Sequence, residues 1–123
     1  MARPHFRFED LEIWQLSKAV AVKFHRLSDQ LEKKRCYRYA EQLRGAALSV
    51  PNNIAEGSAS PHSREFLQFL NIARRSLFEN ASMLLVFEAL ELFPAGSIDE
   101  LLCDCDRFSR MITRFAETKR QPL

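Results

Sequence analysis

Apolar residues recur at intervals of three and four along most of this chain, and that interval constrains its fold more than any other feature. The clearest series lies near the C-terminus and runs without a break: Ile98, Leu101, Cys105, Phe108, Ile112 and Phe115. An α-helix has 3.6 residues per turn, so a series with this spacing lies on one helix face. The sequence therefore predicts an all-α protein.

The stretch SVPNNIAEGSASP, residues 49–61, is the one place where the helical pattern meets strong turn residues. On a helical wheel an apolar stripe passes through Pro51 without losing phase, and it consists of Cys36, Leu43, Ala47, Val50 and Ile54. We therefore predict a continuous helix, although a proline inside a helix costs about 3 kcal/mol. The alternative is a break at which Ser49 caps a new short helix.

Turn and capping residues divide the chain into four predicted helices, at roughly 9–30, 32–57, 61–93 and 98–118. Asp10 is a possible N-cap of the first, and Gly57 suits the left-handed position after the second. Ser60 and Pro61 suit the start of the third helix. A capping box is predicted at the start of the fourth, from Ser97 and Glu100. Short links favour antiparallel neighbours, so residues 1–123 are expected to form one domain, an antiparallel up-down four-helix bundle.

The third predicted helix carries two apolar stripes. One is suited to the bundle core, and the other contains Leu67, Phe78, Ala81 and Leu85. A helix that is apolar on two sides is buried on two sides. The second stripe, around Phe78 and Leu85, is predicted either to form a subunit interface or to pack between two helices of a single bundle.

Composition limits the class of protein. Hydrophobic residues make up 46% of the 123 residues, which excludes a disordered chain, and the net charge at pH 7 is only +2. No apolar run approaches the roughly 20 residues that span a bilayer, and the N-terminus lacks the apolar core of a signal peptide. We therefore expect a soluble cytoplasmic protein without membrane contact.

Three stretches resemble one known family: FEDLEIW at 8–14, QLRGAALSVPNNIAEG at 42–57 and EFLQFLNIARRSLFE at 65–79. Together they are similar to the four-helix-bundle family that includes the 23S rRNA intervening-sequence proteins, with accessory proteins of diversity-generating retroelements as distant relatives. The resemblance implies an antiparallel bundle that assembles as a ring-like homopentamer. It implies no established catalytic activity, and nucleic-acid binding has been suggested for the family.

The family motif contains polar residues that are candidates for a site: Asn53, Glu56, Gly57 and Glu79. Asn53 and Glu56 are three residues apart and share a helix face. The cluster is predicted either to contact a ligand or RNA, or to form a polar network that fixes helix register. A pair of catalytic carboxylates is a further hypothesis, but no third group or cleft accompanies it in the sequence.

Basic residues gather in two places that are candidates for RNA contact. One group lies around the start of the second helix and contains Lys33, Lys34, Arg35 and Arg38; the other is a face of the fourth helix with Arg107, Arg110 and Arg114. Arginine can bind phosphate through two hydrogen bonds at once. Tyr37 and Tyr39 are the aromatic candidates for stacking on bases, unless both face the core. A solvated face with interspersed acids is the alternative for both groups.

No metal or cofactor site is expected. Cys103 and Cys105 are two residues apart on a predicted helix, so they point in different directions and cannot share one zinc ion. Cys105 is predicted to be a core residue and Cys103 a surface thiol. The leading functional hypothesis is a non-enzymatic homo-oligomer that engages RNA or an RNA-bound partner. A protein-interaction scaffold without nucleic-acid contact is the alternative.

Overall fold

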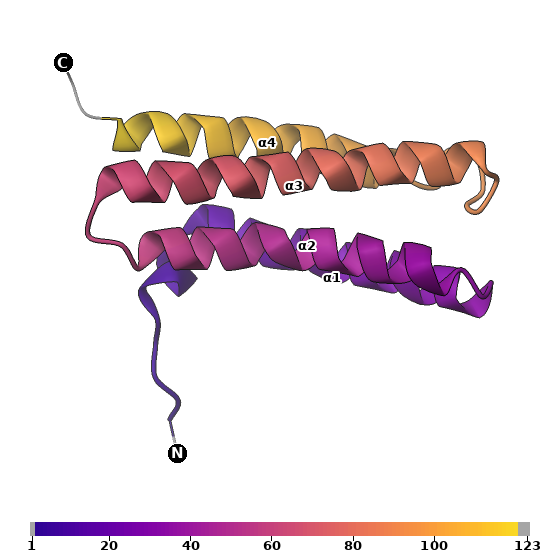
Figure 1. Cartoon of the computed structure of the whole chain (residues 1–123), viewed down its shortest axis with the longest axis horizontal. Helices are drawn as coiled ribbons and strands as arrows, with labels where there is room; N and C mark the ends of the chain where they lie inside the picture. Colours follow the sequence, from indigo (N-terminus) through magenta and orange to yellow (C-terminus); the bar gives the residue numbers. More distant parts are fainter. Residues whose placement is uncertain (1, 121–123) are drawn as a thin grey trace.

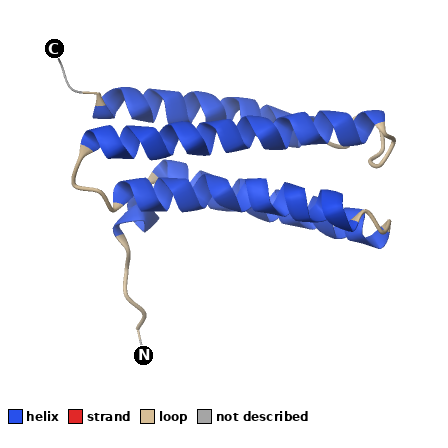
Figure 2. Cartoon of the chain, viewed as in Figure 1, coloured by secondary structure: helices blue, strands red, loops and turns tan. Residues whose placement is uncertain are grey.

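The computed structural model describes residues 2–120 and contains, within them, four α-helices and no strand (Figures 1 and 2). The helices are α1 (Glu12–Lys33), α2 (Tyr37–Ser58), α3 (Ser63–Ala89) and α4 (Asp99–Lys119), and a short 3-10 turn, η1 (Arg7–Asp10), precedes them. The predicted all-α class is therefore confirmed.

Each helix packs on the next one along the chain, and α4 also packs on α1. The α1–α2 and α3–α4 links lie at one end of the molecule, and the α2–α3 link lies at the other (Figure 1). Aromatic contacts agree with this course: Tyr39 near the start of α2 meets Phe87 near the end of α3, with ring centroids 4.8 Å apart. Phe66 near the start of α3 meets Phe115 near the end of α4 at 5.6 Å.

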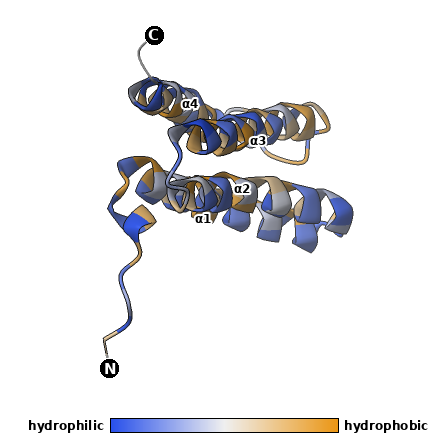
Figure 3. Cartoon of the chain, turned by 60° about the vertical axis from the view of Figure 1, so that its left-hand side comes forward, coloured by the Kyte–Doolittle hydropathy of each residue, from blue (hydrophilic) through white to orange (hydrophobic). Residues whose placement is uncertain are grey.

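Hydrophobic and hydrophilic residues alternate along the helices (Figure 3), as expected for helices that bury one face. The core is continuous along the bundle, and its fully buried side chains include Phe24, Leu43, Ile54, Leu77 and Ile112. Polar side chains are buried among them as well, and the largest is Asn80. Asn80 is 0% exposed, and within the described residues neither atom of its amide group has a hydrogen-bond partner.

Helix α2 runs through Pro51 without a break, as the phase of its apolar stripe predicts. Pro51 is itself buried, and its neighbours Val50 and Ile54 are 2% and 0% exposed. Burial of a large apolar side chain contributes about 1.5–3 kcal/mol, so core packing on both sides of Pro51 offsets the missing backbone hydrogen bond.

The structure corrects the predicted ends of two helices, because α1 and α3 each finish in a Schellman motif. The backbone N–H of Cys36 donates to Leu31 O at 2.9 Å, and that of Leu92 donates to Phe87 O at 3.0 Å. The residues before these donors, Arg35 and Glu91, adopt left-handed φ angles of 64° and 61°. The second helix therefore begins at Tyr37 rather than near residue 32, and the third ends at Ala89 before Phe93 is reached.

The predicted helix starts were also wrong in detail. Asp10 belongs to η1, and its carboxylate accepts a hydrogen bond from His5 at 2.8 Å, so Leu11 takes the N-cap position of α1. Helix α3 begins at Ser63, after His62, rather than at residue 61. Helix α4 has Ile98 at its N-cap without a side-chain bond, so the capping box of Ser97 and Glu100 does not form.

Gly57 lies inside α2, not beyond its end, and it permits a close approach of α3. A Cβ atom at this position would lie 2.7 Å from Cδ1 of Phe66 and 2.8 Å from Cβ of Phe69. Such distances are shorter than any normal carbon contact. Glycine is therefore needed at this position because no side chain fits against α3. It does not occupy the left-handed position after a helix that the sequence predicted.

Only part of the second apolar stripe of α3 is covered within the single chain, because Leu67 and Ala81 are half-buried and the other two members are exposed. Phe78 and Leu85 are 47% and 54% exposed, so the interpretation that they pack between two helices of one bundle is wrong. Val86 and Leu90 are exposed in the same part of the helix. None of the helices in the described part of the chain combines the length and apolar character that crossing a bilayer requires.

The close contact at Gly57 yields a prediction with a matched control in the same helix. Gly57→Ala should lower the free energy of unfolding by about 1–3 kcal/mol, because the new methyl group overpacks the contact with Phe66 and Phe69. At Gly45 an added Cβ meets no atom within 4 Å, so Gly45→Ala should instead raise stability by up to about 1 kcal/mol. Urea denaturation of both variants measures the difference. Equal effects of the two changes would contradict this role of Gly57.

Candidate functional site

A polar seam joins α2 to α3 near the middle of the bundle. The hydroxyl groups of Ser49 and Ser76 lie 2.9 Å apart. The Asn53 side-chain amide donates to Ser49 O at 2.7 Å and to Ser49 Oγ at 2.9 Å. Asn53 belongs to this seam, but its hydrogen bonds go to Ser49 and not to Glu56 or Glu79, with which it was predicted to form a polar cluster. Sequence analysis missed both serines, although Ser49 lies one helical turn before Asn53.

The structure does not bring the motif's two carboxylates together. Glu56 adjoins Gly57, which faces Phe66 and Phe69 of α3. Glu79 lies ten residues further along α3 than Phe69, a distance of about 15 Å at the helical rise of 1.5 Å per residue. Carboxylates that cooperate in glycoside hydrolysis are roughly 5–9.5 Å apart. Glu56 and Glu79 are both exposed and lie too far apart to act on one bond.

Two of the three predicted arginines on α4 are paired with acids of their own helix. Arg107 donates to Asp104 at 2.8 Å, and Arg110 donates to Asp106. Asp104 is shared with Lys23 of α1 at 2.6 Å, and this hydrogen bond raises the pKa of Lys23. Part of the positive charge on this face of α4 is therefore already balanced. The ion pair between Lys23 and Asp104 also links α4 to α1.

The other basic group forms a corner at the α1–α2 link, which we define as Lys33, Lys34, Arg35 and Arg38. All four side chains are exposed. Lys34 donates through Nζ to the Leu92 carbonyl and so ties the corner to the α3–α4 link. The other three are absent from the ion pairs that the described residues form, which involve different cations. The corner therefore keeps most of its charge available.

A neighbouring arginine pairs with two acids of α1 that lie close to the corner. Arg44 of α2 binds Asp29 of α1 at 2.6 Å and also binds Glu32, which directly precedes Lys33. Its hydrogen bond to Glu32 holds the pKa of that carboxyl below its ordinary value. Glu32 therefore stays ionised and paired with Arg44, and its charge is largely balanced there.

The two tyrosines beside the corner differ in their surroundings. Tyr37 is 59% exposed, whereas the ring of Tyr39 packs at 4.8 Å from the ring of the buried Phe87. Tyr37 thus has a face available for stacking, and Tyr39 is mainly a packing residue. The structure brings Tyr37, Arg35 and Arg38 together at one end of the bundle, far along the chain from the α4 arginines.

An apolar groove between α1 and α2 was not foreseen from the sequence. Its volume is about 480 Å³, and its lining includes Phe8, Trp14, Val22, Leu48 and Pro51. The rings of Phe8 and Trp14, both in the lining, lie 4.8 Å apart. Val22 and Leu48 are 43% and 56% exposed. The only sequence signal was that both lie off the core stripes of their helices.

The cysteines lie as the helical spacing predicts: Cys105 is buried and Cys103 is exposed. Burial, with a smaller contribution from the charge of Asp104, raises the pKa of the Cys105 thiol to about 12. Within residues 2–120, no three His, Cys, Asp or Glu side chains are placed so that they could hold a metal ion together.

The fold and its surfaces define a four-helix, all-α protein with one basic corner, one apolar groove and an apolar outer surface on α3. The family model described as 23S rRNA-intervening sequence protein matches residues 9–114. Because this range covers most of the chain, the chain belongs to that family, and the resemblance drawn from the sequence motifs is confirmed. No curated protein matches the chain.

The thiols provide a test of the site description. At pH 8 Cys103 should react rapidly with a thiol-specific reagent, whereas Cys105 should react only after denaturation, because its raised pKa leaves almost no thiolate. Raising the pH to 9 should leave Cys105 protected. Peptide mass spectrometry after timed labelling assigns each thiol, the half-buried Cys36 included, and Cys103→Ser should remove the fast labelling assigned to residue 103. Labelling of native Cys105 as fast as Cys103 would contradict the burial.

Proposed function

We propose that this chain is a non-enzymatic, homo-oligomeric RNA-binding protein: an antiparallel up-down bundle that assembles into a ring of five copies and holds RNA backbone at its basic corners. Membership of the 23S rRNA-intervening sequence protein family supports the proposal. The observation that carries it is the corner itself, where Lys33, Arg35 and Arg38 are exposed around Tyr37.

The Schellman motif that ends α1 places Arg35 at the corner. Arg35 adopts a φ of 64°, a position where glycine avoids the steric cost of a side chain. Non-glycine residues in such conformations cost of order 1 kcal/mol or more. Glu91 has the same geometry at the end of α3, so the left-handed backbone belongs to the helix end, and the exposure of the Arg35 side chain is what supports a contact at the corner.

In an oligomer the basic corner would be present once in every copy of the chain. The net charge of the chain at pH 7 is only +2, so one corner on its own would bind RNA weakly. Copies in one ring would contact the same RNA at several points, and the linked contacts raise the overall affinity. In this proposal Arg107, Arg110 and Arg114 are secondary contacts, because acids already pair with Arg107 and Arg110.

A protein-interaction scaffold remains the second candidate, and a specific observation favours it. Phe78, Leu85, Val86 and Leu90 expose large apolar side chains along α3, and contact with a nucleic acid backbone does not require them. In that case the chain would join proteins without touching RNA.

The salt dependence of RNA binding tests the leading proposal. Each phosphate contact to a single strand contributes a slope of about −0.7 to the plot of log K against log salt concentration. The combined change of Lys33, Arg35 and Arg38 to Gln should therefore flatten the slope by about 2 and weaken binding. Fluorescence anisotropy with single-stranded and structured RNA at several salt concentrations measures both quantities.

A matched control removes the same amount of charge elsewhere. Changing Arg107, Arg110 and Arg114 to Ser should reduce affinity less than the corner variant does, with helicity checked by circular dichroism. If the wild type shows no binding even at low salt, the RNA proposal fails and the scaffold becomes the better account. If the α4 variant loses more affinity than the corner variant, the site is misplaced.

Arg35 alone separates stability from function. Arg35→Gly should keep or raise the free energy of unfolding by up to about 1 kcal/mol, because glycine adopts the left-handed conformation without a Cβ clash. The same change should lower RNA affinity, because one phosphate contact is lost. Thermal denaturation and anisotropy on the same preparation give both values. Unchanged affinity would show that Arg35 is not a contact.

A further inference from the structure

Helix α3 has a second apolar face that points away from the core. We define this outer face as Phe78, Leu85, Val86 and Leu90, which are 47–54% exposed. Small residues, Ser82 and Ala89, lie between them. The spacing of seven and eight residues from Phe78 to Leu85 and Val86 is the spacing of a helix stripe that packs on another helix. A monomer leaves such a face uncovered, at a cost in exposed apolar area.

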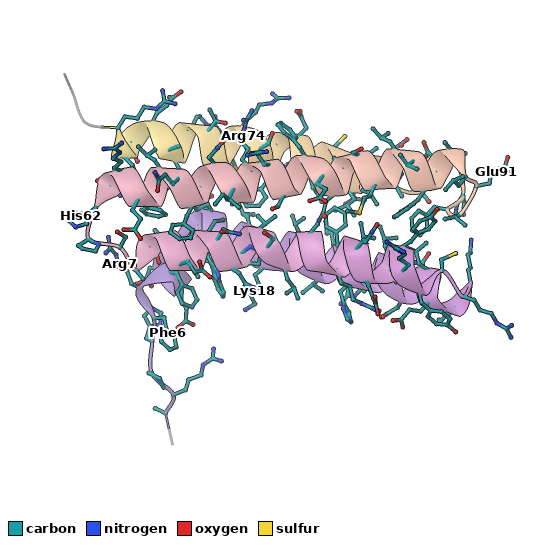
Figure 4. The ribbon with its side chains drawn as sticks, viewed as in Figure 1. Phe6, Arg7, Lys18, His62, Arg74 and Glu91 are labelled. Carbon is teal, nitrogen blue, oxygen red and sulfur yellow. The ribbon has the colours of Figure 1, made fainter. Side chains whose placement is uncertain are left out.

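The groove and the outer face lie on different sides of the bundle. The groove is formed by α1 and α2, and Lys18 lies within its lining. The outer face adjoins α4, because the Arg74 guanidinium stacks at 4.8 Å from the Phe78 ring and Arg74 also borders α4 residues Ile112 and Ala116. Figure 4 shows Lys18 on the lower side of the molecule and Arg74 on the upper side.

The two surfaces match in length and in character. Along α1 the groove extends from Trp14 to His25, which is about 17 Å at 1.5 Å per residue. The outer face extends from Phe78 to Leu90, about 18 Å by the same measure. The groove and the outer face are both mainly apolar. Packing one against the other would remove apolar area from water on both, which is favourable.

Charged side chains border both surfaces. Lys18 lies over the Trp14 ring, 5.6 Å from its centroid, and its side chain is exposed at the groove. Glu79 is exposed next to Phe78 and lies one heptad before Val86. Lys18 in the groove would attract Glu79 and repel Arg74 and Arg75 beside Phe78, so the charges favour a seating in which Lys18 lies toward Glu79 and away from these arginines.

We propose that the groove between α1 and α2 is the docking site for the outer face of α3 from a second copy of this chain. The inference rests on the proposed homo-oligomer and specifies its interface. Because the two surfaces differ and one copy can use both at once, the contact is heterologous, and such contacts close into rings when the rotation permits. A symmetric pairing of two outer faces would instead end at a dimer.

Complementary variants test the pairing. Leu48→Glu places a charge in the groove, and Leu85→Glu places one on the outer face; both positions are exposed in the chain, so the fold should survive. Each variant alone should fall from the mass of several chains to that of one in light scattering at micromolar concentration. The control, Cys103→Glu on exposed α4 surface, should keep the wild-type mass.

Mixing the two variants is decisive. The Leu48→Glu chain retains an intact outer face and the Leu85→Glu chain retains an intact groove, so the mixture should form pairs with the mass of two chains. If Leu48→Glu alone keeps the wild-type mass, or if the mixture stays monomeric, the groove does not receive α3 and the inference is overturned. A monomeric wild type would overturn the proposed oligomer as well.

Milder variants guard against misfolding. If circular dichroism shows that either glutamate variant has lost helicity, Val22→Gln replaces the groove change and Val86→Gln replaces the outer-face change. The same loss of mass in each, and its recovery in the mixture, is then expected. Retention of the full mass by both glutamine variants would contradict the proposed contact.

Discussion

The close approach of α2 and α3 is the contact on which the rest of this structure depends. At Gly57 the helices come so near that no Cβ fits against Phe66 and Phe69. Ser49 and Ser76 meet in the middle of the pair, and Tyr39 meets Phe87 near the other end. These three contacts fix the axial level of every residue on the two helices. Consequently they also decide which polar residues can meet and which cannot, because a helix has little freedom to slide once its ridges are packed.

This register explains why the motif residues have different roles. Asn53 lies at the level where α2 and α3 exchange hydrogen bonds, so its amide closes the polar seam. Glu56 and Glu79 lie at different levels and both face outward. Gly57 acts through the absence of a side chain. Residues that form one motif along the sequence thus have different roles: Gly57 allows close packing, Asn53 forms hydrogen bonds, and Glu56 and Glu79 lie on the surface. They do not form one catalytic centre.

The all-α class and the continuity of the helix through Pro51 could be predicted from the sequence. The spacing of apolar residues along a helix indicates directly which face is buried. The sequence could not distinguish between two local structures that favour the same residue type. Gly57 suits both a helix end and a close contact, and only the position of Phe69 on another helix distinguishes them. The helix ends at Lys33 and Ala89 were missed because Arg35 and Glu91 occupy left-handed positions that glycine usually marks. The groove was missed because it depends on how α1 lies against α2.

The positions of the basic corner and the groove are compatible with simultaneous use. The groove occupies α1 between Trp14 and His25, whereas the corner begins at Lys33, beyond the end of the groove. Rotational symmetry in a closed ring would bring every corner to the same rim, since each copy is oriented alike about the axis. Apolar burial along the sides of the bundle would then hold the ring, and the exposed cations at one end would remain free for a polyanion. The separation follows from the bundle itself, because its long sides offer area for packing, whereas the exposed cations gather at the α1–α2 link at one end.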